Sequence, residues 1–295
     1  FGTGDKAVKI GGENVFPLYS FDAAIENAPK VGIEITDFGM EHEPECIKKY
    51  YEGCATLADM ARKAASMEGV DFLSFRMEGG DPNGANKSTE ELIGELKEIA
   101  DAVDLPLVVC GCKNVEKDAE LFSKAAEALN GKNAVILSAK EENYKTVGAA
   151  AGLAYKQIVG AESAVDINLA KQLNVLISQL GVDSKSVVMN VGSAAVGYGF
   201  EYVISTMDRV KAAALQQGDA NLQMPIITPV ASEAWGVKEA MASETDAPEW
   251  GSQEERGIDM EVETAMAVIA AGSNAVILKH PESIKIISGL MKELV

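Results

Sequence analysis

The chain has 295 residues, of which 47% are hydrophobic and 24% are charged, a composition typical of a globular protein with a large buried core. Its formal net charge of −19 repels phosphate backbones and anionic lipids, which argues against nucleic-acid and membrane-surface binding. Four cysteines are too few for a disulfide framework in a chain of this size, so we expect a reducing compartment.

The sequence contains no charged and apolar leader and no apolar run of membrane-spanning length. We therefore expect a cytoplasmic protein. The first residue is Phe1 and not methionine, so a leader removed by processing remains an alternative.

Eight short runs rich in valine and isoleucine follow an N-terminal extension, residues 1–30. Because these runs are apolar on both faces, they are typical of parallel strands that are buried on both sides. They comprise residues 31–39, 70–78, 105–112, 133–140, 158–164, 186–192, 224–231 and 274–280.

The segments between the runs carry apolar stripes at helical spacing, which predicts amphipathic helices. Ser88 with Glu91 predicts a capping box at the start of one helix. Glycines 131, 181, 218 and 272 stand where helices are expected to end. The stripes are Leu92, Leu96, Ile99 and Val103, then Leu169, Leu173, Leu176 and Leu180, then Val203, Met207, Val210 and Ala214.

Eight alternating strand and helix units predict an α/β protein with a single (β/α)8 TIM barrel over residues 1–295. A doubly wound open sheet is the alternative. The similar heptapeptides GKNAVIL (131–137) and GSNAVIL (272–278) precede the fourth and eighth strands. They indicate either a duplicated half-barrel or two similar turns.

Polar residues follow the predicted strands, and in a TIM barrel such residues meet at one end. We expect there either a polar ligand site with acid/base groups or a layer of ion pairs that closes the barrel. The candidates are Thr36, Asp37, Arg76, Glu78, Cys110, Cys112, Ser138, Lys140, Glu162, Asn190, Thr228, Lys279 and His280.

The sequence gives weak support for a Schiff-base lysine, a metal site or an iron–sulfur cluster at this end of the barrel. A Schiff-base amine at Lys140 or Lys279 would need a lowered pKa, and an ion-paired lysine is the commoner arrangement. His42 and His280, with Asp37 or Glu41, lack the spacing of a metal site. The four cysteines lack CxxC spacing, which argues against an iron–sulfur cluster in this chain. We therefore expect neither a catalytic set nor a metal site.

Two loops are candidates for binding. The turn DPNGAN (81–86) is explained by its own turn chemistry, although Asp81, Asn83 or Asn86 could contact a ligand. The connection 236–257 after the seventh strand is long enough to be a lid or a binding surface. Trp235 and Trp250 border it, either as interface residues or as anchors of the loop.

The segment NVGSAAVGYGFEY (190–202) follows the sixth strand and contains Gly192, Gly197 and Gly199 around Tyr198. It lacks the third glycine of GxGxxG and the lysine of a P-loop, so a phosphate site is not favoured. We predict that its backbone comes close to a large planar ligand or a partner surface, with a tight turn as the alternative.

Several motifs together closely resemble the small (delta) subunit of the corrinoid iron–sulfur protein, a member of the acetyl-CoA decarbonylase/synthase system. The resemblance extends from VGIEITDFG onward over nearly the whole chain. The motifs are ENYKTVGAAAGLAYKQ (142–157), DINLAKQLNVLI (166–177), GYGFEYVISTMDRVKAAALQ (197–216), ASEAWGVKEA (231–240), EWGSQEERGI (249–258) and LKHPESI (278–284).

The resemblance implies a TIM barrel that pairs with a large (gamma) subunit, which carries the iron–sulfur cluster and a cobalamin-binding domain. It implies that cobalamin lies between the two subunits. The cobalt would receive a methyl group from methyltetrahydrofolate through a methyltransferase and deliver it to acetyl-CoA synthase/CO dehydrogenase. The chain has no DxHxxG corrinoid motif, as expected if the partner holds both cofactors, and would be a non-catalytic or weakly catalytic subunit.

Within this framework we predict which residues face the corrinoid or the large subunit: Asn190, Gly197, Tyr198, Gly199, Trp235 and Trp250. The alternative is a stand-alone pterin-dependent methyltransferase, in which Asp37, Asp81 and Asn190 would hold the pterin and polarise its nitrogen.

Overall fold

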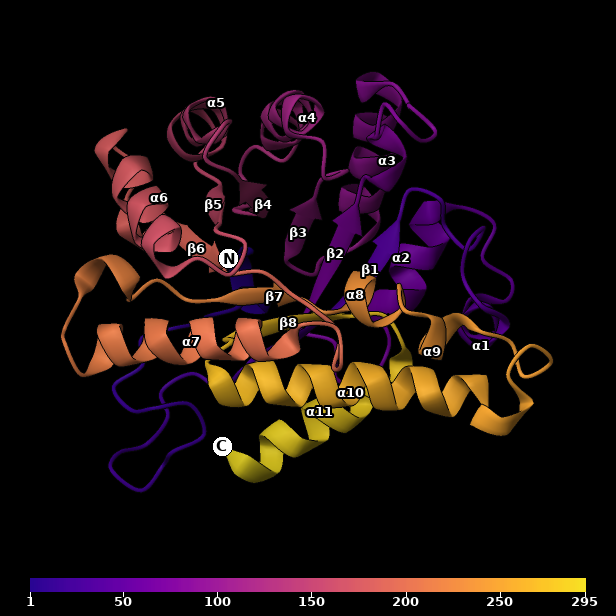
Figure 1. Ribbon diagram of the computed structural model, residues 1–295. Helices are drawn as coiled ribbons and strands as arrows, with labels where there is room; N and C mark the ends of the chain where they lie inside the picture. The colour runs from indigo at the N-terminus through magenta and orange to yellow at the C-terminus, as the bar shows by residue number, and fades with distance from the viewer.

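A computed structural model describes residues 1–295 and contains one sheet of eight parallel strands (Figure 1). The hydrogen-bonded strand order is β6-β5-β4-β3-β2-β1-β8-β7, and a bridge between Met189 and Ile226 joins the two outer strands. The predicted TIM barrel is confirmed. The strands are β1 (Lys30–Thr36), β2 (Phe72–Arg76), β3 (Leu107–Cys110), β4 (Val135–Ala139), β5 (Ile158–Glu162), β6 (Val187–Asn190), β7 (Ile227–Pro229) and β8 (Ala275–Leu278).

Helices follow every strand and cover the outside of the barrel. No helix is both long and apolar enough to cross a membrane. The helices are α1 (Glu45–Lys48), α2 (Leu57–Ala65), α3 (Thr89–Ala102), α4 (Val115–Ala128), α5 (Tyr144–Val147), α6 (Ile167–Gln179), α7 (Phe200–Leu215), α8 (Ala231–Ala234), α9 (Lys238–Met241), α10 (Gln253–Ala271) and α11 (Pro281–Leu294).

The barrel interior is a small apolar core that begins at the N-terminal ends of the strands. The ring of Phe72 lies inside the barrel beside Gly32 of β1, and Phe1 of the N-terminal segment packs edge-on against it at 5.3 Å between ring centroids. A separate core of 59 buried residues lies between the strands and the helices. The two cores leave the C-terminal ends of the strands as the place where polar groups gather.

The predicted helix stripes are confirmed in α3 and α7 and differ in α6. In α7 all four predicted residues are buried. In α6 the buried residues are Ala170, Leu173, Asn174 and Ile177. Of the four predicted leucines only Leu173 is buried, and the other three are partly exposed. The buried face of α6 includes a polar residue because Asn174 points inward and donates to the backbone oxygen of Asn221 at 2.8 Å.

Helix caps agree in part with the expectation. Ser88 accepts a hydrogen bond from the backbone of Glu91 at the start of α3, but the reciprocal bond of a capping box is absent there. The complete capping box joins Thr56 and Asp59 at the start of α2. All four predicted glycines have positive φ after the helices that they follow.

The long connection after β7 is an ordered structure organised by one arginine. It contains α9 and a short 3-10 turn, Pro248–Trp250, and its last residues form the first turn of α10. Arg256 donates hydrogen bonds to three backbone oxygens of this loop, those of Glu239, Ala242 and Gly251. Long helices α7 and α10 lie side by side and both begin near the end of the barrel where α9 is found (Figure 1).

Glu261 of α10 fastens the helix layer to the end of β8. Its carboxylate is fully buried and accepts the backbone N–H groups of Lys279 at 2.6 Å and His280 at 3.1 Å, where α11 begins. Ser283 and Trp235 lie beside the carboxylate and favour its charged form, although neither forms a hydrogen bond of normal geometry. Burial outweighs these donors and raises the pKa of Glu261 to about 6.

Replacing Gly32 with alanine should destabilise the barrel. A Cβ at this position would meet the Phe72 ring at 2.2 Å, and overpacking of a buried site costs about 1–3 kcal/mol. Chemical denaturation measures the loss. The matched control is G289A, because a Cβ added at Gly289 in α11 would meet no atom within 4 Å, so this variant should lose no stability. Equal stability of the two variants would contradict the packing argument.

The pH dependence of Glu261 provides a second test. Its pKa is raised from the ordinary value of 4.5 to about 6, so the folded state binds its proton more tightly than the unfolded state. The resulting stabilisation is fully present below pH 4.5 and is lost as the pH rises through 6. At ~1.4 kcal/mol per pH unit it amounts to about 2 kcal/mol.

Chemical denaturation of the wild type and of E261Q across this pH range measures the effect. Because glutamine does not titrate, the stability of the wild type relative to E261Q should be greatest at low pH and should fall as the pH rises. E263Q on the exposed face of the same helix is the control and should leave the pH profile unchanged. A wild-type to E261Q difference that does not vary with pH would refute the assignment.

Candidate functional site

A cavity of about 320 Å³ opens at the C-terminal end of the barrel, the predicted location of the site. This volume lies at the lower end of the range of small-molecule sites. We call it the mouth cavity. Its polar lining residues are Arg76, Cys110, Lys113, Asp118, Ser138, Lys140, Glu162, Asn190, Ser193, Ser232 and Glu233.

One wall of the mouth cavity is a chain of hydrogen-bonded groups from three neighbouring strands. Lys140 Nζ lies 3.3 Å from a Glu162 oxygen, and Ser138 donates to the other Glu162 oxygen at 2.7 Å. Asn190 Nδ2 donates to Ser138 Oγ at 3.1 Å, while Asn190 Oδ1 accepts the N–H of Gly192. The acceptors in this wall are thus used by protein donors.

Arg76 is a buried cation of the cavity lining and is only 7% exposed. Its Nε donates to Glu34 Oε2 at 3.0 Å, and Nη2 approaches the same oxygen at 2.8 Å in an ion pair without hydrogen-bond geometry. Burial alone would lower the pKa of Arg76, but the Glu34 carboxylate raises it above its usual range, so the guanidinium stays charged.

The thiols near the cavity are not activated nucleophiles. Burial raises the pKa of Cys110 to about 11, and its sulfur pairs with the Ser74 hydroxyl. Burial also raises the pKa of Cys112 to about 12, and Asp118 accepts both its N–H and its S–H. Because a thiolate is the reactive form, these cysteines are structural.

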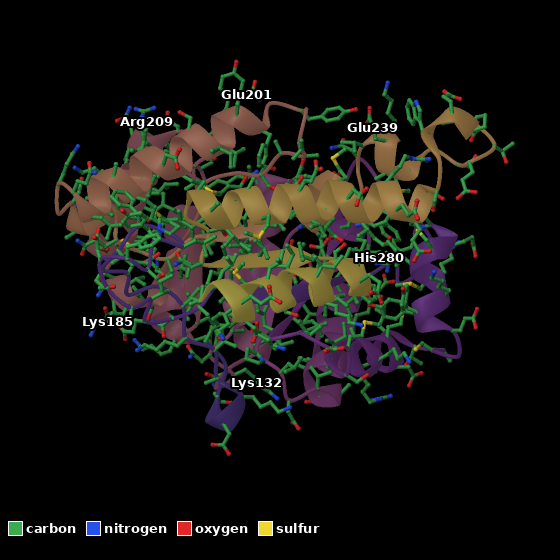
Figure 2. The ribbon with its side chains drawn as sticks, turned by 90° about the horizontal axis from the view of Figure 1, so that it is seen from below. Lys132, Lys185, Glu201, Arg209, Glu239 and His280 are labelled. Atoms are coloured by element: carbon green, nitrogen blue, oxygen red, sulfur yellow. The ribbon has the colours of Figure 1, made fainter.

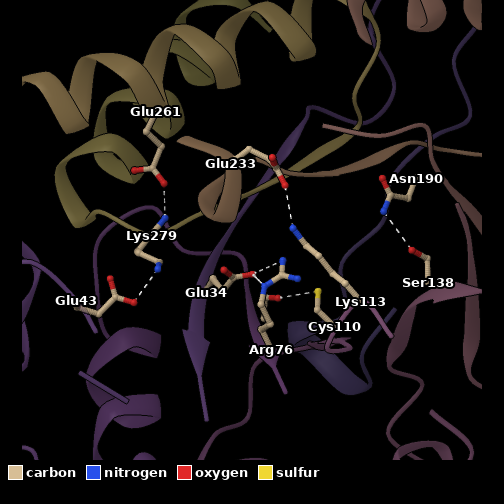
Figure 3. Close-up of polar contacts among 11 residues, drawn as sticks. Glu34, Glu43, Arg76, Cys110, Lys113, Ser138, Asn190, Glu233, Glu261 and Lys279 are labelled. Atoms are coloured by element: carbon tan, nitrogen blue, oxygen red, sulfur yellow. Dashed lines mark hydrogen bonds and ion pairs between the residues drawn. The ribbon is translucent and has the colours of Figure 1, made fainter. Parts of the chain in front are cut away.

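An ion pair joins two residues that line the mouth cavity. Lys113 from the loop after β3 reaches Glu233 of α8 at 3.1 Å (Figure 3). Both side chains are partly exposed, so the pair contributes little to stability.

Other residues at the strand ends form separate ion pairs outside the cavity. The Asp37 side chain is fully buried, accepts the N–H of Gly79 and pairs with Lys87 at 3.0 Å. Asp81 caps its own turn by accepting from the backbone of Asn83. Asp37 and Asp81 therefore do not meet Asn190 in the mouth cavity.

Lys279 is an ion-paired lysine. Its Nζ contacts Glu43 at 2.7 Å; burial alone would lower the pKa of Lys279, but this carboxylate raises it above its usual range. A Schiff-base amine requires the opposite shift.

His280 is a buried structural residue. It stacks on Trp235 at 5.8 Å, caps α11 by accepting the N–H of Glu282, and lies 3.3 Å from Glu254. Burial lowers its pKa. His42 packs edge-on against Phe38 on the loop after β1. No group of three or more His, Cys, Asp or Glu side chains is arranged to hold a metal ion.

The glycine segment after β6 bends at all three glycines. Gly192, Gly197 and Gly199 have φ of 103°, 85° and 82°, a region that glycine tolerates, and Gly199 precedes the first turn of α7. Nothing lies within 4 Å of a Cβ at Gly197. The backbone conformation therefore explains these glycines, and open space remains beside Gly197.

Tyr198 and the two tryptophans lie in different environments. The Tyr198 hydroxyl donates to Glu239 of α9 at 2.6 Å and so links the glycine segment to the long loop. Trp250 is partly exposed, with Lys238 and Arg256 beside its ring. Trp235 is only 5% exposed, and its indole occupies space that is free because Gly257 of α10 has no side chain. Its ring does not reach the surface.

Sequence reasoning missed Glu34, Lys113, Asp118, Ser193, Glu233 and Arg256. Glu34 carried a signal, since it is a charged residue between Ile33 and Ile35 in the middle of a strand. Lys113 and Glu233 are 120 positions apart, and no local pattern indicates that they meet.

The fold is shared with dihydropteroate synthases. The enzyme from Xanthomonas albilineans in complex with 7,8-dihydropteroate superposes with a TM-score of 0.57 and 12% identity over 90% of this chain and 94% of that chain. The enzyme from Thermus thermophilus gives a TM-score of 0.55 at 12% identity over 96% of this chain and 100% of that one. At this identity the likeness concerns the fold alone.

Sequence comparison identifies closer relatives. The acetyl-CoA decarbonylase/synthase complex subunit delta of Methanothermobacter thermautotrophicus is 32% identical over 96% of this chain and 71% of its own length. Subunit delta 1 of Methanosarcina thermophila is 29% identical over 99% of this chain and 67% of its own length, and the Archaeoglobus fulgidus subunit 30% over 99% and 65%. The chain spans about two thirds of the length of these relatives.

The family model described as CO dehydrogenase/acetyl-CoA synthase delta subunit matches residues 1–291. The match covers the barrel, the glycine segment and the long loop together, and it confirms the resemblance drawn from the motifs. The chain belongs to the CO dehydrogenase/acetyl-CoA synthase delta subunit family.

Proposed function

We propose that this chain is the small subunit of a heterodimeric corrinoid iron–sulfur methyl carrier within an acetyl-CoA decarbonylase/synthase complex. Membership of the delta subunit family carries the proposal. The large (gamma) subunit is the expected partner that holds the iron–sulfur cluster and binds cobalamin. A methyltetrahydrofolate methyltransferase and acetyl-CoA synthase/CO dehydrogenase are the expected donor and acceptor proteins.

The surface around the mouth cavity supports this role. Five large apolar side chains are exposed on the segments that follow β5, β6 and β7: Val165, Tyr198, Tyr202, Met241 and Trp250. We call them the rim residues. Tyrosine and tryptophan are enriched where protein interfaces derive most of their affinity. Figure 2 shows Glu239 and His280 toward this end of the molecule and Arg209 and Lys185 toward the other.

The rim also suits a large planar cofactor held between two proteins. A corrin macrocycle is much larger than the mouth cavity and would lie over it. The open backbone at Gly197 and the ring of Trp250 offer flat surfaces, and the Tyr198–Glu239 bond holds their two loops together. Trp235, which is buried, would act by supporting the rim, while Asn190 lies deeper in the cavity.

The corrinoid, when bound, supplies the cobalt that carries the methyl group. The residues of this chain would orient the macrocycle and exclude water from one of its faces. The alternative of a stand-alone pterin-dependent methyltransferase loses support because Asp37 is occupied by Lys87 and lies outside the cavity that contains Asn190.

One co-purification tests the proposed function. The tagged chain, isolated from cells that contain the complex, should bring down a chain that carries a corrinoid, recognisable by its visible absorption spectrum. Recovery of this chain without any corrinoid protein would contradict the proposal.

The rim can be tested in the same assembly. Tyr202 is 66% exposed, and its replacement by alanine should weaken the heterodimer about 30-fold, as expected for the loss of an interface aromatic worth about 2 kcal/mol. W250A should act in the same direction. The control is F21A, because Phe21 is 88% exposed on the N-terminal segment, which packs near the opposite ends of the strands. A weaker complex with F21A and an unchanged complex with Y202A would place the interface elsewhere.

A further inference from the structure

We propose that the mouth cavity is a binding site for a small monocarboxylate, distinct from the surface over which a corrinoid would lie. The inference does not rest on the proposed function, because it concerns groups beneath the rim that belong to this chain alone. It rests on an imbalance between donors and acceptors in the cavity.

Most acceptors of the cavity wall are occupied. Glu162 receives Ser138 and pairs with Lys140, Ser138 Oγ receives Asn190, and Asn190 Oδ1 receives the backbone of Gly192. Asp118 Oδ1 receives two donors from Cys112, and Glu233 Oε1 pairs with Lys113. The second oxygens of Asp118 and Glu233 are the carboxylate acceptors that remain for a ligand.

Several donors, in contrast, are free. Arg76 uses Nε and Nη2 on Glu34, and its Nη1 has no hydrogen-bond partner in the protein. Asn190 Nδ2 has two hydrogens, of which one bonds to Ser138. Lys140 has three N–H groups and a single ion-pair partner. The Ser193 hydroxyl is buried without a partner in the lining of the same cavity. These donors converge from the ends of three strands, β2, β4 and β6, and complement acceptor oxygens.

Charge narrows the class of ligand. Each of Arg76, Lys113 and Lys140 is paired with one carboxylate, and Asp118 is a further acid in the lining, so the cavity carries no excess positive charge. The net charge of −19 adds a long-range penalty for multiply charged anions such as phosphate esters. A single carboxylate has two acceptor oxygens and one charge, and the guanidinium and ammonium donors that face it form the stronger kind of hydrogen bond.

Three probes of similar size test the donor argument on the full chain: propionate, propionamide and propylammonium. Ligand-detected NMR titration should give saturable binding of propionate, weaker binding of the uncharged propionamide, and none of propylammonium. Propylammonium binding as tight as propionate, or the absence of saturable propionate binding, would overturn the proposal.

Variants locate the binding. K140Q removes one charged donor and should weaken propionate binding about tenfold, the effect of losing roughly 1.4 kcal/mol, which is within the range of a charge-assisted hydrogen bond. N190D is isosteric, places a negative charge in the cavity and should abolish binding. The control K185Q alters an exposed lysine near the N-terminal end of β6 and should bind as the wild type does.

The unfolding temperature of each variant shows whether it is folded, and the two cavity variants provide independent tests. Propionate binding that is unchanged in a folded K140Q or N190D protein would refute the assignment to this cavity.

Discussion

The buried carboxylate of Glu261 is the constraint on which the C-terminal end of the barrel depends. It holds the first backbone N–H groups after β8 and thereby fixes where α11 begins. It also lies beside Trp235, whose ring stacks on His280 and fills the space left by Gly257. A buried acid that is matched by several donors costs less than an isolated one, but its raised pKa shows that part of the cost of burial remains.

This anchoring extends to the long connection after β7, which several contacts attach to the rest of the barrel. Trp235 attaches its beginning to the core, and Arg256 binds three of its backbone oxygens from the first turn of α10. The Tyr198–Glu239 hydrogen bond then links it to the segment after β6. The exposed aromatic residues of the rim are therefore held in place before any partner binds, which reduces the entropy that binding would cost.

The polar layer inside the rim consists of two parts. Asp37 with Lys87 and Glu43 with Lys279 are closed ion pairs with structural roles. The groups between β2 and β6 also form pairs, yet they surround a cavity and keep donors without partners. An ion-pair layer and an open polar cavity thus occupy adjacent sectors of the same barrel end.

The sequence by itself determined the barrel and the family. Runs that are apolar on both faces and stripes at helical spacing are local consequences of burial, so they can be read without knowing the contacts, and the family motifs are contiguous segments. Tertiary structure decided what each polar residue does. Asn174 lies on the buried face of α6 because its side chain donates to the backbone oxygen of Asn221. Trp235 is buried because Gly257 has no side chain at the place where the indole packs. Lys113 and Glu233 form an ion pair that exists only in the folded chain. Burial, pKa and the choice of ion-pair partner depend on distances between remote residues, and those distances exist only in the folded barrel.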